Sequence, residues 1–195
     1  MNIDKFKNAI GGGVRSSLFR VQGDIGRLGK DDRVNFLCTA AQLPASTLSE
    51  TTAPFRGRLL KIPTARTFDA WTITILSDRG MELRSKFEQW MDSINGARDN
   101  VEQIDGAVTN FESSFLTNWR VQQLDRSGKP VKSYELYYCY PTSVSAVDLD
   151  SGDADSLSSF TATLSYSYFL TSAVSTGGNP RGNCQIVTGK QHLQM

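Results

Sequence analysis

The chain has 195 residues, of which 39% are hydrophobic and 21% are charged, and its formal net charge is +1. This composition is typical of one globular domain, and the balanced charge gives no reason to expect wrapping of nucleic acid or attraction to a membrane surface. The sequence contains no run of about 18 apolar residues, so we expect no membrane insertion by the monomer. Three cysteines, Cys38, Cys139 and Cys184, form no C-x-x-C pair and are expected to be reduced thiols.

The N-terminal part is predicted to contain an arm followed by two strands. Residues 1–16 end in the glycine run Gly11–Gly13 and are expected to form a mobile arm. The segments SLFRVQGDIG and VNFLCTAAQLP predict two strands joined by the polar turn GKDD. Pro44 ends the second strand because proline has no N–H to donate to a sheet.

Residues 45–68 are interpreted as a long β-hairpin or extended loop that projects from the body, with turn signals at Pro54 and Gly57. From Pro54 to Phe68 this segment contains no acidic residue but four basic ones, Arg56, Arg58, Lys61 and Arg66. The next segment, AWTITIL, alternates β-branched with apolar residues and predicts a strand.

A single long amphipathic helix is predicted over 79–95, with Asp78 as its N-cap and Gly96 at its C-terminal end. Its apolar residues recur at helical spacing, so they are expected to pack against a sheet. The predicted helix–sheet core comprises Trp71, Leu83, Phe87, Trp90 and Ile94.

The second half of the chain predicts a hairpin from FLTNWRVQQLD and VKSYELYYCYP around the turn RSGKP. A short strand, SVSAVDL, then leads into an acidic loop that carries Asp148, Asp150, Asp153 and Asp155. Residues 97–113 give no clear pattern. The C-terminal extension, 171–195, has CQIV as its only strand-like piece.

The segment SSFTATLSYSYF alternates strictly and predicts a strand with one buried face. The core side is expected to carry Phe160, Ala162, Leu164, Tyr166 and Tyr168. The other side carries only hydroxyls, from Ser159, Thr161, Thr163, Ser165 and Ser167. A strand face in bulk water usually carries some Lys or Glu, so this uncharged face is expected to meet something else. The whole pattern predicts a mainly β fold of two packed antiparallel sheets, a β-sandwich or barrel, with one flanking amphipathic helix.

No residue pattern indicates catalysis or a cofactor. The single histidine, His192, lies in a polar tail, and the GGGV segment lacks the Lys-Ser/Thr of a phosphate-binding loop. The acidic loop does not match a calcium-binding loop, because Ser159 stands where a bidentate Glu is required. The sequence therefore argues against an enzyme and predicts no cofactor. A ligand-binding β-sandwich is a second hypothesis, against which the three tryptophans count because their strand and helix patterns predict burial.

Three blocks, FLCTAAQLPAST, RLLKIPTARTFDAWTITILSDRG and LRSKFEQWMDSING, follow one another in an order that resembles the tail tube proteins of T4-like contractile-tailed bacteriophages. SLFRVQGDIG, YPTSV and FTATLSYSYF extend this resemblance over most of residues 17–169. It implies a tail tube domain over 17–170 and hexameric rings whose inner sheets join edge to edge. It also implies a stacked tube, through which DNA passes during injection. A tube of a headless contractile injection system or a type VI secretion system is the alternative within the same class.

The resemblance implies as partners further copies of the chain, the tail sheath, baseplate and tail terminator proteins, and the tape measure protein and DNA in the lumen. It implies a place in the virion tail after assembly in the host cytoplasm. Within this picture, the hydroxyl face is expected either to line the lumen or to meet a neighbouring subunit. The basic hairpin residues are expected to avoid the bore, because cations there would hold DNA phosphates. The hairpin is instead expected to reach a neighbouring subunit or ring, with the acidic loop as one candidate partner, and to become ordered there together with the N-terminal arm.

Overall fold

The computed structural model describes residues 2–11, 13–98, 115–150, 152 and 157–173. Two antiparallel sheets make up the body, and we call them sheet I and sheet II. Sheet I has the strand order β1 (Phe19–Gly23), β6 (Thr117–Leu124), β7 (Pro130–Val144) and β9 (Tyr168–Ala173). Sheet II has the order β7, β8 (Ser159–Ser165), β5 (Trp71–Leu76) and β2 (Cys38–Ala41).

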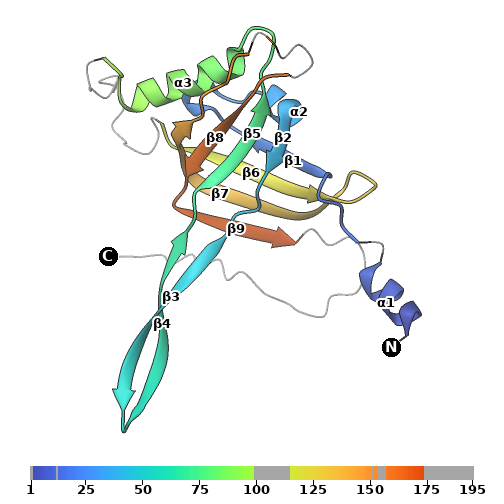
Figure 1. The fold of residues 1–195 in the computed structure, drawn as a ribbon, viewed down its shortest axis with the longest axis vertical. Helices are drawn as coiled ribbons and strands as arrows, with labels where there is room; N and C mark the ends of the chain where they lie inside the picture. The colour runs from blue at the N-terminus through green and yellow to red at the C-terminus, as the bar shows by residue number, and fades with distance from the viewer. Residues whose placement is uncertain (1, 12, 99–114, 151, 153–156, 174–195) are drawn as a thin grey trace, which may run out of the picture.

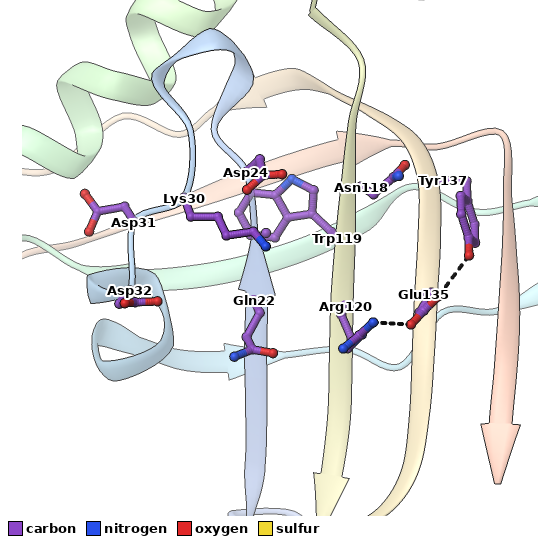
Figure 2. A pocket seen from close by; sticks show the side chains of 11 residues that line it. Gln22, Asp24, Lys30, Asp31, Asp32, Asn118, Trp119, Arg120, Glu135 and Tyr137 are labelled. Carbon is purple, nitrogen blue, oxygen red and sulfur yellow. Dashed lines mark hydrogen bonds and ion pairs between the residues drawn. The ribbon is translucent and has the colours of Figure 1, made fainter. Parts of the chain in front are cut away.

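Figure 1 shows the strands of the two sheets crossing at a steep angle. The predicted mainly β sandwich is thus confirmed, whereas the two sheets do not close into a barrel within the described chain. In sheet I the register sets Gln22, Arg120 and Glu135 in one row across β1, β6 and β7 (Figure 2).

The long strand β7 belongs to both sheets and makes the corner between them. Its residues Lys132–Tyr137 pair with β9, and Tyr140–Val144 pair with β8. Between these segments Tyr138 has a φ of 58°, a left-handed conformation, and the register of β7 against β6 shifts nearby. A local irregularity of this kind bends a strand and lets it pass from one sheet to another.

The core lies between the two sheets and is filled by alternate strand residues from both. Its largely inaccessible strand residues are Val21, Trp71, Ile73, Ile75, Trp119, Val121, Leu136, Phe160, Ala162 and Leu164. The Trp71 and Trp119 rings meet edge to face with centroids 5.8 Å apart, which joins sheet II to sheet I at the centre of the core.

Helix α3 (Glu82–Ile94) packs on the sandwich at the end opposite the long hairpin (Figure 1). Leu83, Phe87 and Trp90 are buried, and Ile94 packs partly buried against the same core. Trp71 lies in the same core as these four helix residues.

The start of α3 differs from the prediction. Met81 adopts a left-handed conformation with a φ of 51°, so the helix begins at Glu82 rather than at Arg79. The predicted N-cap, Asp78, still accepts a hydrogen bond from the Leu83 N–H at 3.5 Å. At the other end the helix stops at Ile94, ahead of the predicted Gly96.

One further N-terminal prediction was partly wrong. The CTAA part of the predicted strand VNFLCTAAQLP forms β2, but the VNFL part forms the short helix α2 (Arg33–Leu37). The Asp31 carboxylate explains this difference, because it accepts a hydrogen bond from the Arg33 N–H at 3.0 Å and turns the chain there. A 3₁₀ turn, η1 (Gly26–Leu28), precedes it.

The arm contains a helix that the sequence did not predict, α1 (Ile3–Ile10). Asn2 caps its start by accepting a hydrogen bond from the Asp4 N–H, and Gly11 ends it in a left-handed conformation. The mobility of residues 1–16 stays a prediction.

In the second half, the predicted strands SVSAVDL and SSFTATLSYSYF were each partly wrong. Only Ser143 and Val144 of the first are in a strand, at the end of β7. The second divides after Ser165, and the chain enters sheet I as β9. For this reason Tyr168, predicted on the core side, is 37% exposed.

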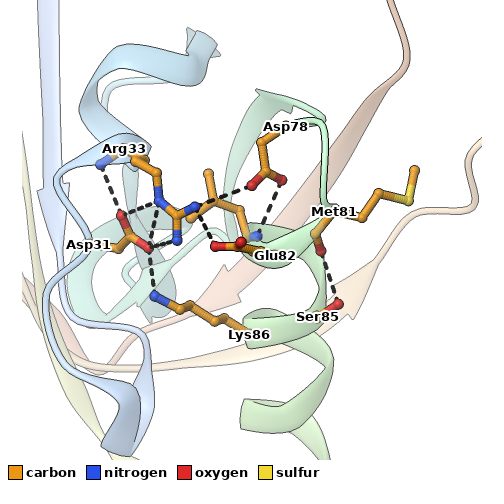
Figure 3. Close-up of polar contacts among 8 residues, drawn as sticks. Asp31, Arg33, Asp78, Met81, Glu82, Ser85 and Lys86 are labelled. Atoms are coloured by element: carbon orange, nitrogen blue, oxygen red, sulfur yellow. Dashed lines mark hydrogen bonds and ion pairs between the residues drawn. The ribbon is translucent and has the colours of Figure 1, made fainter.

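A network of charges fastens the loop before α2 to the start of α3 (Figure 3). Asp31, only 7% exposed, accepts from the Arg33 guanidinium at 2.8 Å and from Lys86 Nζ at 2.6 Å. Arg33 also contacts Asp78 at 3.3 Å and Glu82 at 2.6 Å. The Arg33 guanidinium, together with Lys86, holds the pKa of Asp31 well below its ordinary value of 3.8.

Asp31→Asn is expected to lower the free energy of unfolding by about 1.5–3 kcal/mol at neutral pH, because hydrogen bonds to charged groups are lost. Since the pKa of Asp31 is depressed on folding, its contribution is present above pH 3.8 and is lost as the pH falls below it. Urea titrations at several pH values should therefore show that the difference in the free energy of unfolding between the two proteins becomes smaller in acid. The exposed Asp92→Asn on α3 is the control, and a gap that stayed constant down to pH 2 would contradict this role.

Candidate assembly interface

The segment between β2 and β5 forms a separate two-stranded hairpin, β3 (Ser46–Phe55) and β4 (Arg58–Phe68). Figure 1 shows it extending far beyond the body, as predicted for residues 45–68. Its two-residue turn has Arg56 at a φ of 46° and Gly57 at a φ of 79°. Positive φ at both positions is typical of a type I′ turn, which matches the twist of paired strands.

One face of the hairpin carries exposed apolar residues. Cross-strand pairing on this side places Ala53 beside Leu60, Phe55 beside Arg58, and Ile62 beside Thr51. We call Ala53, Phe55, Leu60 and Ile62 the apolar face. Phe55, Leu60 and Ile62 are 66%, 60% and 40% exposed. A two-stranded hairpin is marginally stable alone in water, so this face is suited to a partner.

All four predicted basic residues lie exposed on this hairpin. Lys61 Nζ contacts Glu50 Oε1 across the strands at 2.7 Å, so part of the charge is balanced locally. The Arg56 guanidinium lies over the Phe55 ring at 5.4 Å.

The acidic loop connects β7 with β8. Asp148 and Asp150 are exposed, whereas Asp153 and Asp155 lie outside the described residues. The hairpin and the connection from β7 to β8 lie toward opposite ends of the long axis (Figure 1). One copy therefore does not bring the two predicted partners together, and a contact between them requires a second copy.

The predicted hydroxyl side is the exposed side of sheet II. Thr163 pairs with Thr72 and with Ser143, and Thr161 pairs with Thr74, their Oγ1 atoms 3.5 Å apart. We define the hydroxyl face as Thr72, Thr74, Ser143, Ser159, Thr161, Thr163 and Ser165. Ser167 is not part of it, because it follows the end of β8 and its N–H donates to the Tyr137 carbonyl at 3.0 Å.

The exposed side of sheet I carries charges and aromatic rings (Figure 2). Arg120 pairs with Glu135, which also accepts a hydrogen bond from the Tyr137 hydroxyl at 2.8 Å. The Tyr137 hydroxyl and Arg120 lower the pKa of Glu135, whose carboxylate in turn raises the pKa of Tyr137. Tyr137 stacks on Tyr168 with ring centroids 5.0 Å apart.

A polar cavity of about 350 Å³ opens at one end of this side (Figure 2). Its lining comprises Gln22, Gly23, Asp24, Lys30, Asp31, Asp32, Asn118, Trp119, Arg120, Glu135 and Tyr137. Asp24 Oδ1 is buried there and has no hydrogen-bond partner among the described residues.

The outermost strands of sheet I, β1 and β9, each pair on one side only within the described residues. Strand directions alternate across the sheet, so β1 and β9 run in opposite directions. Unpaired strand edges of this kind are templates for pairing with another chain.

Ordinary catalytic chemistry has little support in the described residues. They contain no group of three or more His, Cys, Asp or Glu side chains placed to hold a metal ion. Cys38 and Cys139 are free thiols, and burial raises their pKa values to about 11 and about 12, which makes them poor nucleophiles. His192 and Cys184 lie outside the described residues. Among the described helices, none is long and apolar enough to span a membrane.

Sequence reasoning missed the apolar side of α1, which its helical spacing could have revealed. Ile3, Phe6 and Ile10 stand at helical spacing on α1, and all three are exposed. The exposed side of sheet I was also missed, and there the mixed polar and aromatic residues give no such signal.

Residues 5–172 match the family model described as "Phage tail tube protein". The chain belongs to this family, whose members are structural proteins of the virion tail.

The tail tube protein gp19 of Enterobacteria phage T4 is 31% identical over 157 residues, which cover 80% of this chain and 90% of the relative. Among solved structures, a chain of the six-fold symmetrised anti-feeding prophage baseplate covers 82% of this chain and 95% of its own length, with 16% identity and a TM-score of 0.61. A chain of the sheath/tube terminator of the extracellular contractile injection system PVC covers 79% and 94%, with 13% identity and a TM-score of 0.57. These structures share the fold with this chain.

Replacing residues 49–65 by Asn-Gly joins the partners Leu48 and Arg66 through a two-residue turn. The melting temperature of the single subunit is expected to stay within about 2 °C of the unmodified value, because the removed segment lies beyond the core. Tubes are expected to be absent in electron micrographs. A large fall in melting temperature, or normal tubes, would contradict a role confined to assembly.

Proposed function

We propose that this chain forms hexameric rings that stack into the inner tube of a contractile phage tail, through which DNA passes during injection. The observation that carries this proposal is sheet I, whose two outer strands, β1 and β9, lack partners on their outer sides in the described chain. A rotation between copies would set β9 of one beside β1 of the next in antiparallel order. Repeated around an axis, this contact closes a ring and leaves no open edge.

The exposed side of sheet I would line the bore. It lies on the opposite side of the sandwich from the hydroxyl face, so the two cannot both face the lumen. Arg120 is paired with Glu135 in the row that also holds Gln22. Because Arg120 is already paired, it would hold DNA phosphates weakly, and this would ease the passage of the polymer. The hydroxyl face would then meet a neighbouring subunit, which is the second of the two expectations drawn from the sequence.

The hairpin would reach the next ring. Its arginines, Arg56 and Arg58, lie at the tip, and the exposed Asp148 and Asp150 lie toward the other end of the molecule. A head-to-tail stack places these opposite charges together. Exposed ion pairs contribute only about 0.2–1 kcal/mol each, so they would set the register between rings more than the strength of the contact. Residues 1–16 and the hairpin would become ordered at this step.

The proposed partners are other copies of this chain, the sheath, baseplate and terminator proteins, and the tape measure protein and DNA in the lumen. Tubes in contractile particles related by fold support the first four, since the similar structures include a baseplate and a sheath/tube terminator. The role is structural rather than enzymatic, with assembly in the host cytoplasm and no membrane insertion by the monomer.

A tube of a headless injection system is the second candidate, favoured by the fold shared with anti-feeding prophage and PVC chains. The higher identity to the T4 protein favours a phage tail. A carbohydrate-binding sandwich has no support, because Trp71, Trp90 and Trp119 are each only 1% exposed.

Purified protein offered a baseplate is expected to give long hollow tubes by negative-stain microscopy. A protein that stayed a single subunit at every concentration, even on the baseplate, would refute the proposed function.

Reversing both tip charges, Arg56→Glu with Arg58→Glu, is expected to stop tube growth while the subunits stay folded. The lysine pair R56K/R58K keeps the charge and should assemble. Adding Asp148→Arg and Asp150→Arg to the reversed protein should restore part of the growth. Tubes of normal length from the reversed protein would exclude this contact.

A further inference from the structure

The polar cavity beside β1 contains a carboxylate whose hydrogen bonding is incomplete. Asp24 Oδ1 is buried and accepts no hydrogen bond from the described residues. Two further carboxylates of the cavity lining, Asp31 and Glu135, are already paired with cations of the same copy. A buried carboxylate oxygen without a donor carries a desolvation cost, and nearly all such oxygens in proteins have a partner. Asp24 is therefore the acceptor in this cavity that lacks a donor.

A loop borders the cavity and limits the free edge of β1. Figure 2 shows the loop of residues 30–32 on the side of β1 that faces away from Arg120. Lys30 in this loop forms an antiparallel bridge with Asp24. Because Lys30 occupies the place beside Asp24, a neighbouring strand can pair with β1 only as far as Gly23.

The alternation of the two edge strands restricts how they can pair with one another. Residues that stand opposite in an antiparallel pair lie on the same side of the sheet. On β1, Gln22 is exposed and Val21 is in the core. On β9, Tyr168 and Leu170 are exposed, whereas Phe169 packs against the core. Even-numbered residues of β1 must therefore stand opposite even-numbered residues of β9.

The longest pairing that obeys this rule and keeps β9 clear of Lys30 sets Tyr168 opposite Gln22. A shift of two residues in one direction would set Tyr168 against the Lys30 bridge, and a shift in the other direction would leave fewer pairs. In this register Asp24 is a diagonal neighbour of Tyr168. Diagonal neighbours are about 7–8 Å apart, which is within reach of an aromatic side chain.

Tyr168 has the chemistry that the cavity lacks. Its ring stacks on Tyr137, but its hydroxyl has no hydrogen-bond partner among the described residues. Of the other exposed residues of β9, Leu170 has no donor, and Ser172 is short and lies toward the far end of the strand. A tyrosine hydroxyl that donates to a carboxylate forms a charge-assisted hydrogen bond, one of the stronger kinds.

Free ions suit the cavity less well than this side chain. Its lining combines carboxylates with the cations Lys30 and Arg120, so a metal ion or an anion would meet charges of its own sign. A neutral donor satisfies Asp24 without adding charge, and the apolar body of a tyrosine fits beside Trp119 in the lining.

We propose that the polar cavity beside β1 receives Tyr168 of the neighbouring copy in the ring, whose hydroxyl donates a hydrogen bond to the Asp24 carboxylate. The site is incomplete in one copy and is completed by the next. This contact rests on the proposed ring and assigns its register, because the Lys30 bridge sets where β9 of the neighbour begins beside β1.

Two tyrosines that stack on each other give a matched pair of variants. Tyr168→Phe is expected to raise the protein concentration required for half-maximal tube growth on a baseplate at least tenfold, because a hydrogen bond to a charged group is lost at every contact. Tyr137→Phe removes a hydroxyl that bonds to Glu135 of the same copy, so it should change this concentration by less than about threefold. Near-ultraviolet circular dichroism checks that both subunits are folded. Equal effects of the two variants would overturn the proposal.

Asp24→Ala tests the acceptor. Because Asp24 Oδ1 has no partner in the single copy, the variant should leave the melting temperature of the subunit unchanged or raise it, and yet weaken tube growth at least tenfold. Adding Tyr168→Phe should weaken growth by less than about threefold more, since the shared hydrogen bond is already absent. Effects of the two substitutions that multiply would show that they act independently and would overturn the proposal.

Cysteine crosslinking tests the register. Copies with Gln22→Cys and copies with Tyr168→Cys, grown together into tubes at high concentration and oxidised, are expected to give a disulfide-linked dimer that neither gives alone. Residues directly opposite have Cβ atoms about 4.5–5.5 Å apart, close to the span of a disulfide. Arg20→Cys with Tyr168→Cys is the control, two residues away, and should give little dimer. An equal yield from the control, or tubes without any link, contradicts the assigned register.

The outcomes separate this contact from the proposed function. If the unmodified protein formed neither rings nor tubes, the proposed function itself would fail. If it formed tubes and the Tyr168→Phe protein grew them equally well, the tube would stand and only this contact would be overturned.

Discussion

The passage of one strand through both sheets is the constraint on which the rest of this molecule depends. β7 pairs with β9 up to Tyr137, with β6 up to Cys139 and with β8 from Tyr140 onward, so the two sheets must cross and must share one core. The crossing exposes one side of each sheet and leaves β1 and β9 at the borders of sheet I. The surfaces available for assembly therefore follow from the bend at a single left-handed residue.

The surfaces divide according to whether their charges find partners within the chain. Asp31 and Glu135 are paired with cations of the same copy, which stabilises the subunit alone. The hairpin carries an excess of positive charge and uncovered apolar residues, and the hydroxyl face carries no charge. In the proposed tube an identical second copy would supply what each of these surfaces lacks, which is the condition for a contact that repeats through a whole assembly.

Period-two and helical patterns predicted the parts of the fold that depend on burial. The strand at Trp71, the stripe Leu83–Phe87–Trp90 and the hairpin over 45–68 were all recognisable. The effects of local backbone chemistry were not recognisable in the sequence. Asp31 turned a strand-like segment into α2, and the left-handed Met81 delayed the start of α3. Alternation also continued across Tyr166 and Ser167, so the change of sheet there left no trace in the pattern. The uncharged face was visible in the sequence, but alternation does not say what lies against it.

The tight turn at Arg56 and Gly57 makes the hairpin a spacer of fixed length. Its strands have ten and eleven residues, so it reaches about 33 Å at 3.3 Å per residue. A two-residue turn leaves no slack, and the length of the strands alone sets how far the tip extends. An insertion of two residues in each strand would lengthen the hairpin and keep the side chains near its tip on their original faces. An insertion of one residue in each strand would move these side chains to the opposite face. In the proposed tube, the distance that the hairpin spans between rings could therefore change only by an even number of residues in each strand.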